Sequence, residues 1–265
     1  MKNPGKIIVL NYHLVADRGT ASPASPDPLY SITTHAFHQQ MQMLHRLTIP
    51  VVPISDLLNN NFNDPFGIAL TFDDGYASDF ETVFPALCEL KFPASFFPFT
   101  GSINQPGRIS WEQLRELSAH GFEIGSHGLT HTVFSRLSAA EQIKELEKSK
   151  TEIENEVQKT VQHFSFPYGW YSNSILKRVE NAGYRSALTT GLRTNKADSR
   201  NFLIYRWNIK RETSIETIRE ILLLNGKIPF SDAVVSRAKF IARRIAGPVL
   251  TDQLNVYAKK FSGVK

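Results

Sequence analysis

The sequence predicts an α/β protein, specifically a distorted (β/α) barrel of about seven strands in a single domain. Short apolar runs alternate with segments of helical pattern along most of the chain. The connections between them are short, which is typical of parallel strands joined by crossover helices. Seven or eight such units in 265 residues favour a barrel over an open sheet.

Eight apolar runs are the predicted strands. They cover residues 7–10, 51–54, 68–72, 94–99, 122–124, 163–166, 187–189 and 203–209. Between most of them, apolar side chains recur on one helical face, as in the group Phe80, Phe84, Leu87 and Leu90. The proline-rich residues 21–28 cannot enter a sheet interior and are expected to form a surface loop.

The composition excludes several classes of protein. Hydrophobic residues make up 42% and charged residues 21%, which is ordinary for a globular chain. No stretch approaches the roughly 18 consecutive apolar residues of a transmembrane helix. The N-terminal apolar run is too short for a secretory signal, so a cytoplasmic location is expected. A nucleic-acid partner is not expected, because no glycine-rich aromatic motif or zinc-finger spacing accompanies the basic residues.

Basic and acidic residues are distributed unevenly along the chain. Residues 1–131 carry 7 basic and 12 acidic side chains, whereas residues 132–265 carry 23 and 13. We therefore expect a barrel over residues 1–226, followed by a basic amphipathic helical extension over residues 227–265, packed on or beside the barrel. This extension suits peripheral contact with an anionic membrane at its inner face, but a helix that packs on a barrel has the same pattern.

The chemistry is concentrated in two segments that follow apolar runs. Asp73 and Asp74 end the third run, and adjacent carboxylates there are tolerated mainly where a cation or a reaction requires them. His127 and His131 add imidazole nitrogens, so that with Asp74 they form a ligand set suited to Zn²⁺ or another divalent transition metal. Three protein ligands leave positions open for water and substrate. Asp73 then suits the role of general base.

Three motifs together resemble those of a known family. They are Thr71-Phe72-Asp73-Asp74-Gly75, His127-Gly128-Leu129-Thr130-His131 and Phe166-Pro167-Tyr168-Gly169. In this order they are similar to the polysaccharide deacetylases with a NodB homology domain, carbohydrate esterase family 4, over roughly residues 5–226. The resemblance implies a distorted (β/α) barrel, Asp73 as the base, and a divalent metal, usually zinc, on Asp74, His127 and His131. It also implies removal of an N-acetyl or O-acetyl group from a sugar.

The third motif and one later segment complete the predicted site. Pro167 fixes the backbone of a wall, and the Tyr168 amide is placed to face a developing oxyanion. Trp207 either lines a pocket for the acetyl methyl group or belongs to the core. Most family members have, where this chain has Ser165, an arginine that orients the catalytic aspartate. Arg206 is predicted to substitute for it and is also counted among the substrate-binding residues.

The general acid is predicted to be His13. The late histidine motif of the family is missing, because no histidine occurs after His163. His13 follows the first strand and is expected to emerge on the same rim as Asp73 and His127. This resembles the branch of the family that acts on poly-N-acetylglucosamine, in which an N-terminal histidine is the acid. A structural histidine at a strand end is the alternative.

These observations favour a metal-dependent deacetylase that acts on an acetylated carbohydrate, either a polysaccharide or a glycan precursor, by means of a metal-activated water. Two other functions stay open at this point. The first is a carbohydrate-binding protein with degraded catalysis, because Ser165 replaces the usual arginine. The second is an amidohydrolase of the same fold that acts on a non-sugar amide.

Overall fold

The computed structural model describes residues 5–17, 28–59, 62–198, 200 and 202–223. The predicted proline-rich loop lies outside these residues apart from Pro28, and so does the predicted basic extension over residues 227–265. Within the described ranges, no helix combines the length and the apolar character needed to cross a bilayer.

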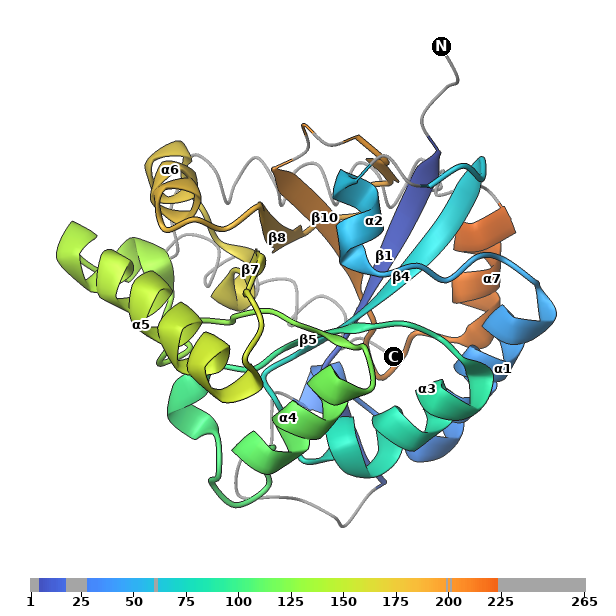
Figure 1. Ribbon diagram of the computed structural model, residues 1–265. Coiled ribbons are helices and arrows are strands. Elements are labelled where there is room, and N and C mark those ends of the chain that lie inside the picture. Colours follow the sequence, from blue (N-terminus) through green and yellow to red (C-terminus); the bar gives the residue numbers. More distant parts are fainter. Residues whose placement is uncertain (1–4, 18–27, 60–61, 199, 201, 224–265) are drawn as a thin grey trace, which may run out of the picture.

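Seven parallel strands in the described part of the chain form a nearly closed barrel (Figure 1). Their order around the barrel is β6 (Glu123–Ile124), β5 (Ser95–Phe97), β4 (Phe66–Asp73), β1 (Lys6–Tyr12), β10 (Leu203–Asn208), β8 (Ser186–Thr190) and β7 (His163–Ser165). Just beyond β6, Ser126 pairs in parallel with Phe164 of β7 and narrows the gap between the two ends. A short strand, β9 (Asn195–Lys196), joins β1 in antiparallel pairing. The predicted barrel of about seven strands is therefore confirmed.

Helices surround the strands (Figure 1). They are α1 (Thr34–Arg46), α2 (Ile54–Leu58), α3 (Phe84–Leu90), α4 (Trp111–Ala119), α5 (Ala139–Val157), α6 (Asn173–Asn181) and α7 (Ile215–Leu223). Capping boxes begin α4 at Ser110 and α5 at Ser138, where each serine accepts the backbone N–H three residues later. Helix α1 packs against α3 and α7 and thus covers β1 and its neighbours.

Short elements connect the main ones at both ends of the barrel. A two-stranded sheet pairs β2 (Leu14–Val15) with β3 (Ser31–Ile32). A π-helix, η2 (Asp79–Val83), leads into α3. The remaining turns are the 3₁₀ helices η1 (Pro28–Tyr30), η3 (Thr100–Ser102), η4 (Phe134–Arg136) and η5 (Pro167–Gly169).

The predicted strand over residues 51–54 is wrong. Val51 makes a single bridge to Ile68, and α2 begins at Ile54. The bridge consists of the Val52 amide donating to Ile68 and the Ile68 amide donating to Pro50. Pro53 has no backbone N–H and follows directly, so pairing cannot continue as a ladder.

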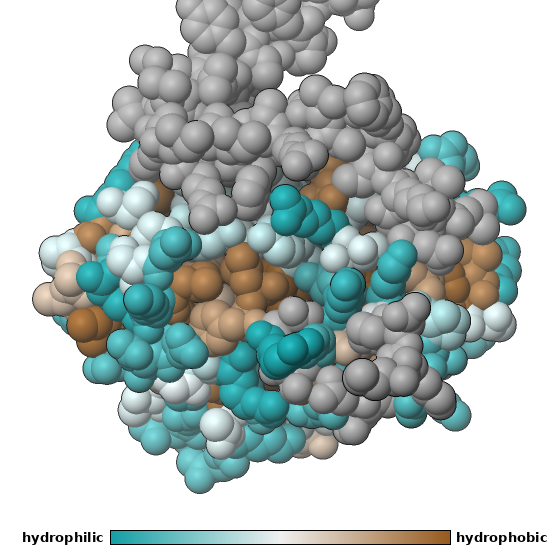
Figure 2. Space-filling view, turned by 90° about the horizontal axis from the view of Figure 1, so that it is seen from above, coloured by the Kyte–Doolittle hydropathy of each residue, from teal (hydrophilic) through white to brown (hydrophobic). Residues whose placement is uncertain are grey.

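Side chains on the strands alternate between the barrel interior and the helix layer. The interior cluster closes the end at which the strands begin, and its strand residues are Ile7, Val9, Ala69, Phe97, Leu188 and Ile204. Helix α2 packs onto this cluster through Ile54, Leu57 and Leu58. Figure 2 views the protein from above; a patch of hydrophobic residues lies near the middle of this face with hydrophilic residues next to it, and further hydrophobic residues lie at its edges. The other end of the interior is polar.

Candidate active site

A layer of polar side chains lies where the strands end. On β1, Asn11 continues the inward series of Ile7 and Val9, and on β10 Arg206 follows the inward Ile204. Thr71 and Asp73 of β4 and Ser165 of β7 complete the layer, and all five residues are at most 2% exposed. Burial of this many polar groups requires partners for them, and most of these partners are found within the layer. Arg206 Nε is the exception, with no partner among the described residues.

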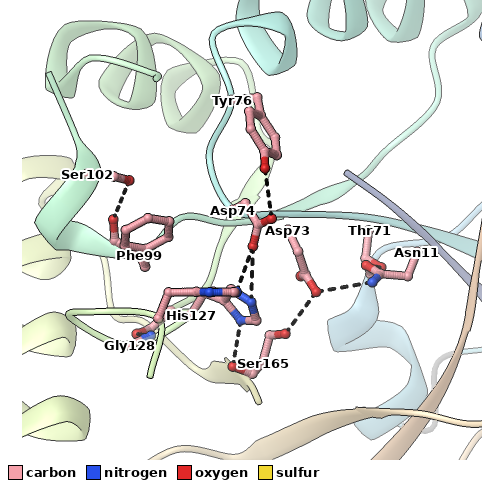
Figure 3. Close-up of polar contacts among 12 residues, drawn as sticks. Asn11, Thr71, Asp73, Asp74, Tyr76, Phe99, Ser102, His127, Gly128 and Ser165 are labelled. Carbon is pink, nitrogen blue, oxygen red and sulfur yellow. Dashed lines mark hydrogen bonds and ion pairs between the residues drawn. The ribbon is translucent and has the colours of Figure 1, made fainter. Parts of the chain in front are cut away.

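Asp73 is held by four hydrogen bonds. Arg206 binds both carboxylate oxygens, with Nη1 donating to Oδ1 at 2.8 Å and Nη2 to Oδ2 at 2.6 Å. Asn11 Nδ2 and Ser165 Oγ also donate to Oδ2, at 3.1 and 3.2 Å (Figure 3). Burial alone would raise the pKa of Asp73, but the charges of Arg206 and His127 and the Arg206 hydrogen bonds hold that pKa at about 2.

Arg206 is itself fixed by the same layer. Its Nη1 donates to Asn11 Oδ1 at 2.8 Å, and its Nη2 donates to Ser165 Oγ at 2.7 Å. The side chain has no exposed surface. The sequence suggested Arg206 as a substitute for the arginine that orients the catalytic aspartate, and also as a substrate-binding residue. In the structure its guanidinium lies on Asp73, beside Ser165. Contact of Arg206 with substrate stays a prediction.

Asp74 lies just outside the sheet and turns away from Asp73. Its backbone has φ +77°, a left-handed conformation that costs free energy in a residue other than glycine. The Asp74 amide donates to the Phe97 carbonyl, and Gly75 continues the turn with φ +63°. A Cβ atom at Gly75 would lie 2.8 Å from Pro98 Cβ, so a side chain does not fit there. The turn therefore directs the two neighbouring carboxylates to different places.

His127 and His131 meet Asp74 Oδ1. Their Nε2 atoms lie 3.3 and 3.1 Å from this oxygen, and the three ligand atoms lie within 4.8 Å of one another. His127 is 2% exposed, whereas the His131 side chain is 23% exposed. The predicted metal ligands are thus brought together on one side of the Asp73 carboxylate.

The donor set fits a divalent metal. His127 Nδ1 lies 2.8 Å from the Ser165 carbonyl oxygen, which can only accept a hydrogen bond, so Nδ1 carries a proton. In the neutral imidazole, Nε2 then presents a lone pair to Asp74 Oδ1, which is buried and receives no hydrogen bond among the described residues. Two acceptors that face each other call for a cation between them. Orientation of a ligating imidazole by a carbonyl is also the usual arrangement in metal sites.

His13 lies at the end of β1, as expected. Its ring packs on Tyr30 with a centroid distance of 4.9 Å, and its Nδ1 is buried without a hydrogen-bond partner in the described part of the chain. Burial lowers the pKa of His13, and the charges of Asp74 and Asp73 act in the opposite direction. The histidine is therefore electrostatically coupled to both aspartates.

The third motif forms a wall next to His131. Tyr168 has φ +60°, and its side chain is exposed at 55% while its ring lies 4.8 Å from that of His131. Pro167 before it is buried. On β10, Trp207 is 5% exposed, packs with the outer hydrophobic cluster and donates Nε1 to the Arg193 carbonyl. Its assignment to an acetyl pocket stays a prediction.

The sequence reasoning missed three residues that contact the aspartates. Asn11 binds Asp73, while Tyr76 and Arg108 contact Asp74. A signal for Asn11 existed, because it is a polar residue at an inward position of an otherwise apolar strand. For Arg108 there was none, because its contact depends on how two distant loops pair.

Comparison with known proteins adds an independent result. Residues 61–187 match the family model described as Polysaccharide deacetylase. The Bacillus subtilis protein YxkH is 24% identical over 209 residues, which cover 77% of this chain and 72% of that protein. The poly-beta-1,6-N-acetyl-D-glucosamine N-deacetylase of Staphylococcus aureus is 23% identical over 223 residues, 75% of this chain and 77% of the relative.

A solved structure shares the fold. The Streptococcus pyogenes deacetylase PplD, determined in complex with acetate, superposes with a TM-score of 0.73 at 22% identity. The match covers 85% of this chain and all of that one. At this level of identity the likeness shows a common barrel architecture.

Proposed function

This chain belongs to the polysaccharide deacetylase family, and on that premise we propose that it is a metal-dependent deacetylase acting on an acetylated carbohydrate. One observation carries the proposal. A carboxylate fixed by Arg206 lies directly beside three convergent ligand atoms of Asp74, His127 and His131. Hydrolysis of an acetamide or acetyl ester needs a base and an electrophile at neighbouring positions. This arrangement supplies the base and the residues that would hold a metal ion as the electrophile.

The residues that would hold the metal are Asp74, His127 and His131, and zinc is the first ion to test. When bound, a divalent ion would polarise the acetyl carbonyl and make a water easier to deprotonate. The buried His127 and the more exposed His131 leave access from the side of Tyr168.

Asp73 is the proposed general base, and its hydrogen bonds indicate which oxygen acts. Among the described residues, Oδ2 accepts from Arg206, Asn11 and Ser165, whereas Oδ1 accepts only from Arg206. Oδ1 therefore keeps lone-pair capacity for the proton of the attacking water. With a pKa of about 2, the carboxylate is ionised at neutral pH and ready to accept that proton.

His13 is the proposed general acid. As water adds to the acetyl carbon, its proton passes to Asp73 Oδ1, and the Tyr168 amide is assigned to the oxyanion that forms. The carbon–nitrogen bond then breaks, and His13 gives its proton to the departing amine nitrogen. The buried Nδ1 of His13, which has no partner among the described residues, is consistent with a nitrogen that acts on substrate.

The proposed substrate class is a polymer that contains N-acetylglucosamine, which follows the Staphylococcus aureus relative by its name. Arg206 weakens the case for a degraded carbohydrate-binding protein, because Asp73 has a guanidinium partner despite Ser165. The cytoplasmic location and the contact of residues 227–265 with an anionic membrane stay predictions within this proposal.

The test is release of acetate from N-acetylglucosamine oligomers by zinc-loaded and by chelator-treated protein. We expect release with zinc only, and a fall of at least about 100-fold in Asp73→Asn, the lower range for loss of a general base. Asp198→Asn is the matched control, because this half-buried aspartate also pairs with an arginine, the exposed Arg200. Zinc-loaded protein that releases no acetate, or an Asp73→Asn variant as active as the control, would overturn the proposal.

A further inference from the structure

The two oxygens of Asp74 have different surroundings. Oδ1 faces the imidazoles of His127 and His131. Oδ2 accepts a hydrogen bond of 3.2 Å from the Tyr76 hydroxyl, which approaches from the opposite side (Figure 3). Tyr76 is 2% exposed, so this hydrogen bond is shielded from water. The predicted ligand therefore presents one oxygen to the metal position while the other is already engaged.

Arg108 supports both Asp74 and Tyr76. Its Nη1 donates to the Asp74 backbone carbonyl at 2.9 Å. Its guanidinium carbon lies 4.2 Å from the centroid of the Tyr76 ring, within the range of a cation–π interaction. It also lies 5.1 Å from the Phe99 ring, which in turn packs on His131. One cation thus contacts the backbone of the ligand and the tyrosine that binds its side chain.

Backbone hydrogen bonds between the segments that contain Tyr76 and Arg108 hold these two residues next to each other. Tyr76 and Arg108 form an antiparallel bridge. The Ala77 amide donates to the Gly107 carbonyl, and the Ile109 amide donates to the Gly75 carbonyl. Asp74 directly precedes these contacts in the chain and has a left-handed backbone, and such a conformation persists only where the surroundings enforce it. The loop around Arg108 supplies that enforcement.

We propose that Tyr76 and Arg108 form a clamp that holds Asp74 as a one-oxygen metal ligand and thereby sets the affinity and coordination number of the site. This inference rests on the proposed function. A carboxylate free to rotate can bind a cation through both oxygens and occupy a position needed by water or substrate. With Oδ2 held by Tyr76, only Oδ1 is available. Both residues are positioning residues, because neither faces the position of the metal itself.

The experiment measures zinc affinity by competition with a chromophoric chelator for the wild type, Tyr76→Phe and Arg108→Met. Loss of an outer partner of a metal ligand typically weakens binding about 10- to 100-fold, and we expect this for both variants. Tyr12→Phe is the matched control, because it also removes a buried hydroxyl, one that donates to Gln40 Oε1 at 3.0 Å in the helix layer. The control should keep the wild-type zinc affinity.

Two further measurements distinguish an effect of Tyr76 on the metal site from a general loss of stability. Thermal melting of the metal-free proteins reports the loss of stability, which Tyr12→Phe should share. The visible absorption of the Co²⁺-loaded proteins reports coordination number, because tetrahedral Co²⁺ absorbs more strongly than ions with more ligands. We expect weaker absorption for Tyr76→Phe than for the wild type and the control. If Tyr76→Phe does not fold, Arg108→Met is judged by the same two readouts.

The outcomes are distinguishable. Zinc affinity and Co²⁺ spectra in Tyr76→Phe that equal those of Tyr12→Phe would overturn the clamp while leaving the deacetylase intact. Failure of the wild type to bind zinc or any other divalent metal would instead overturn the proposed function, and the clamp with it. Reduced zinc affinity in Tyr76→Phe and Arg108→Met, with an altered Co²⁺ spectrum in Tyr76→Phe but not in Tyr12→Phe, supports the clamp.

Discussion

Removal of the Arg206 guanidinium should destabilise the protein far more than removal of an exposed arginine. In Arg206→Met, Asp73 loses its cationic partner, while Asn11 Oδ1 and Ser165 Oγ lose a donor. The charges of Arg206 and His127 and the Arg206 hydrogen bonds together outweigh burial and hold the pKa of Asp73 at about 2 instead of 3.8. This net difference corresponds to about 2 kcal/mol at 1.36 kcal/mol per unit, and we take it as the scale of the ionic contribution. Two lost hydrogen bonds add about 1 kcal/mol each. The total of about 4 kcal/mol agrees with the usual cost of breaking a buried ion pair.

The assay is urea unfolding of the metal-free proteins at pH 7, followed by circular dichroism, in a double-mutant cycle with Asp73→Asn. The double variant has neither charge, so its cost should fall short of the sum of the single costs by about 2–3 kcal/mol. Arg200→Met breaks the exposed pair with Asp198 and should have no measurable effect. Additive costs in the cycle, or an Arg206→Met variant as stable as Arg200→Met, would refute the reasoning.

Three further predictions follow from the same geometry. The pKa of Asp73 is depressed, so its pairing with Arg206 stabilises the protein above about pH 4, and this stabilisation is lost as the pH falls towards 2. In acid titrations, the difference in unfolding free energy between wild type and Arg206→Met should therefore shrink over this range. Free zinc at 100 times its dissociation constant should stabilise the wild type by about 2.7 kcal/mol, and chelation should remove this gain in thermal melts. Gly75→Ala should unfold at lower urea than Gly121→Ala, because both glycines have positive φ but only Gly75 has Pro98 within 2.8 Å of the added carbon; equal midpoints would contradict the steric reason.

Much of the barrel and of the metal-ligand cluster could be predicted from the sequence. Apolar runs identify the strands, and parallel strands place their final residues on one rim. This is why Asp74 and His127, which are far apart in the chain, could be expected to meet. The segment of residues 51–54 misled the prediction, because its apolar character resembles a strand while Pro53 prevents a continued ladder.

The environment of Asp73 could be predicted only in part, because it depends on register between strands. Asn11 lies opposite Thr71 in the pairing of β1 with β4, and Val9 lies opposite Arg206 in the pairing of β1 with β10. These pairings bring Asn11 and Arg206 onto the Asp73 carboxylate and place Thr71 within hydrogen-bond distance of both. Inward and outward alternation can be read from each strand, but the offset between strands cannot.

The strand register explains why a serine can stand at position 165 in place of an arginine. Arg206 reaches Asp73 from β10 and places Nη2 within 2.7 Å of Ser165 Oγ, so a small hydroxyl fills the remaining space and accepts a hydrogen bond. An arginine at position 165 would bring a second cation into a layer whose residues are at most 2% exposed, where an unpaired charge is costly. A small residue at position 165 therefore goes together with an arginine at position 206. Within the proposed function, Ser165 gives no reason to expect a weaker base. A guanidinium still binds both oxygens of Asp73, but it comes from Arg206 on β10.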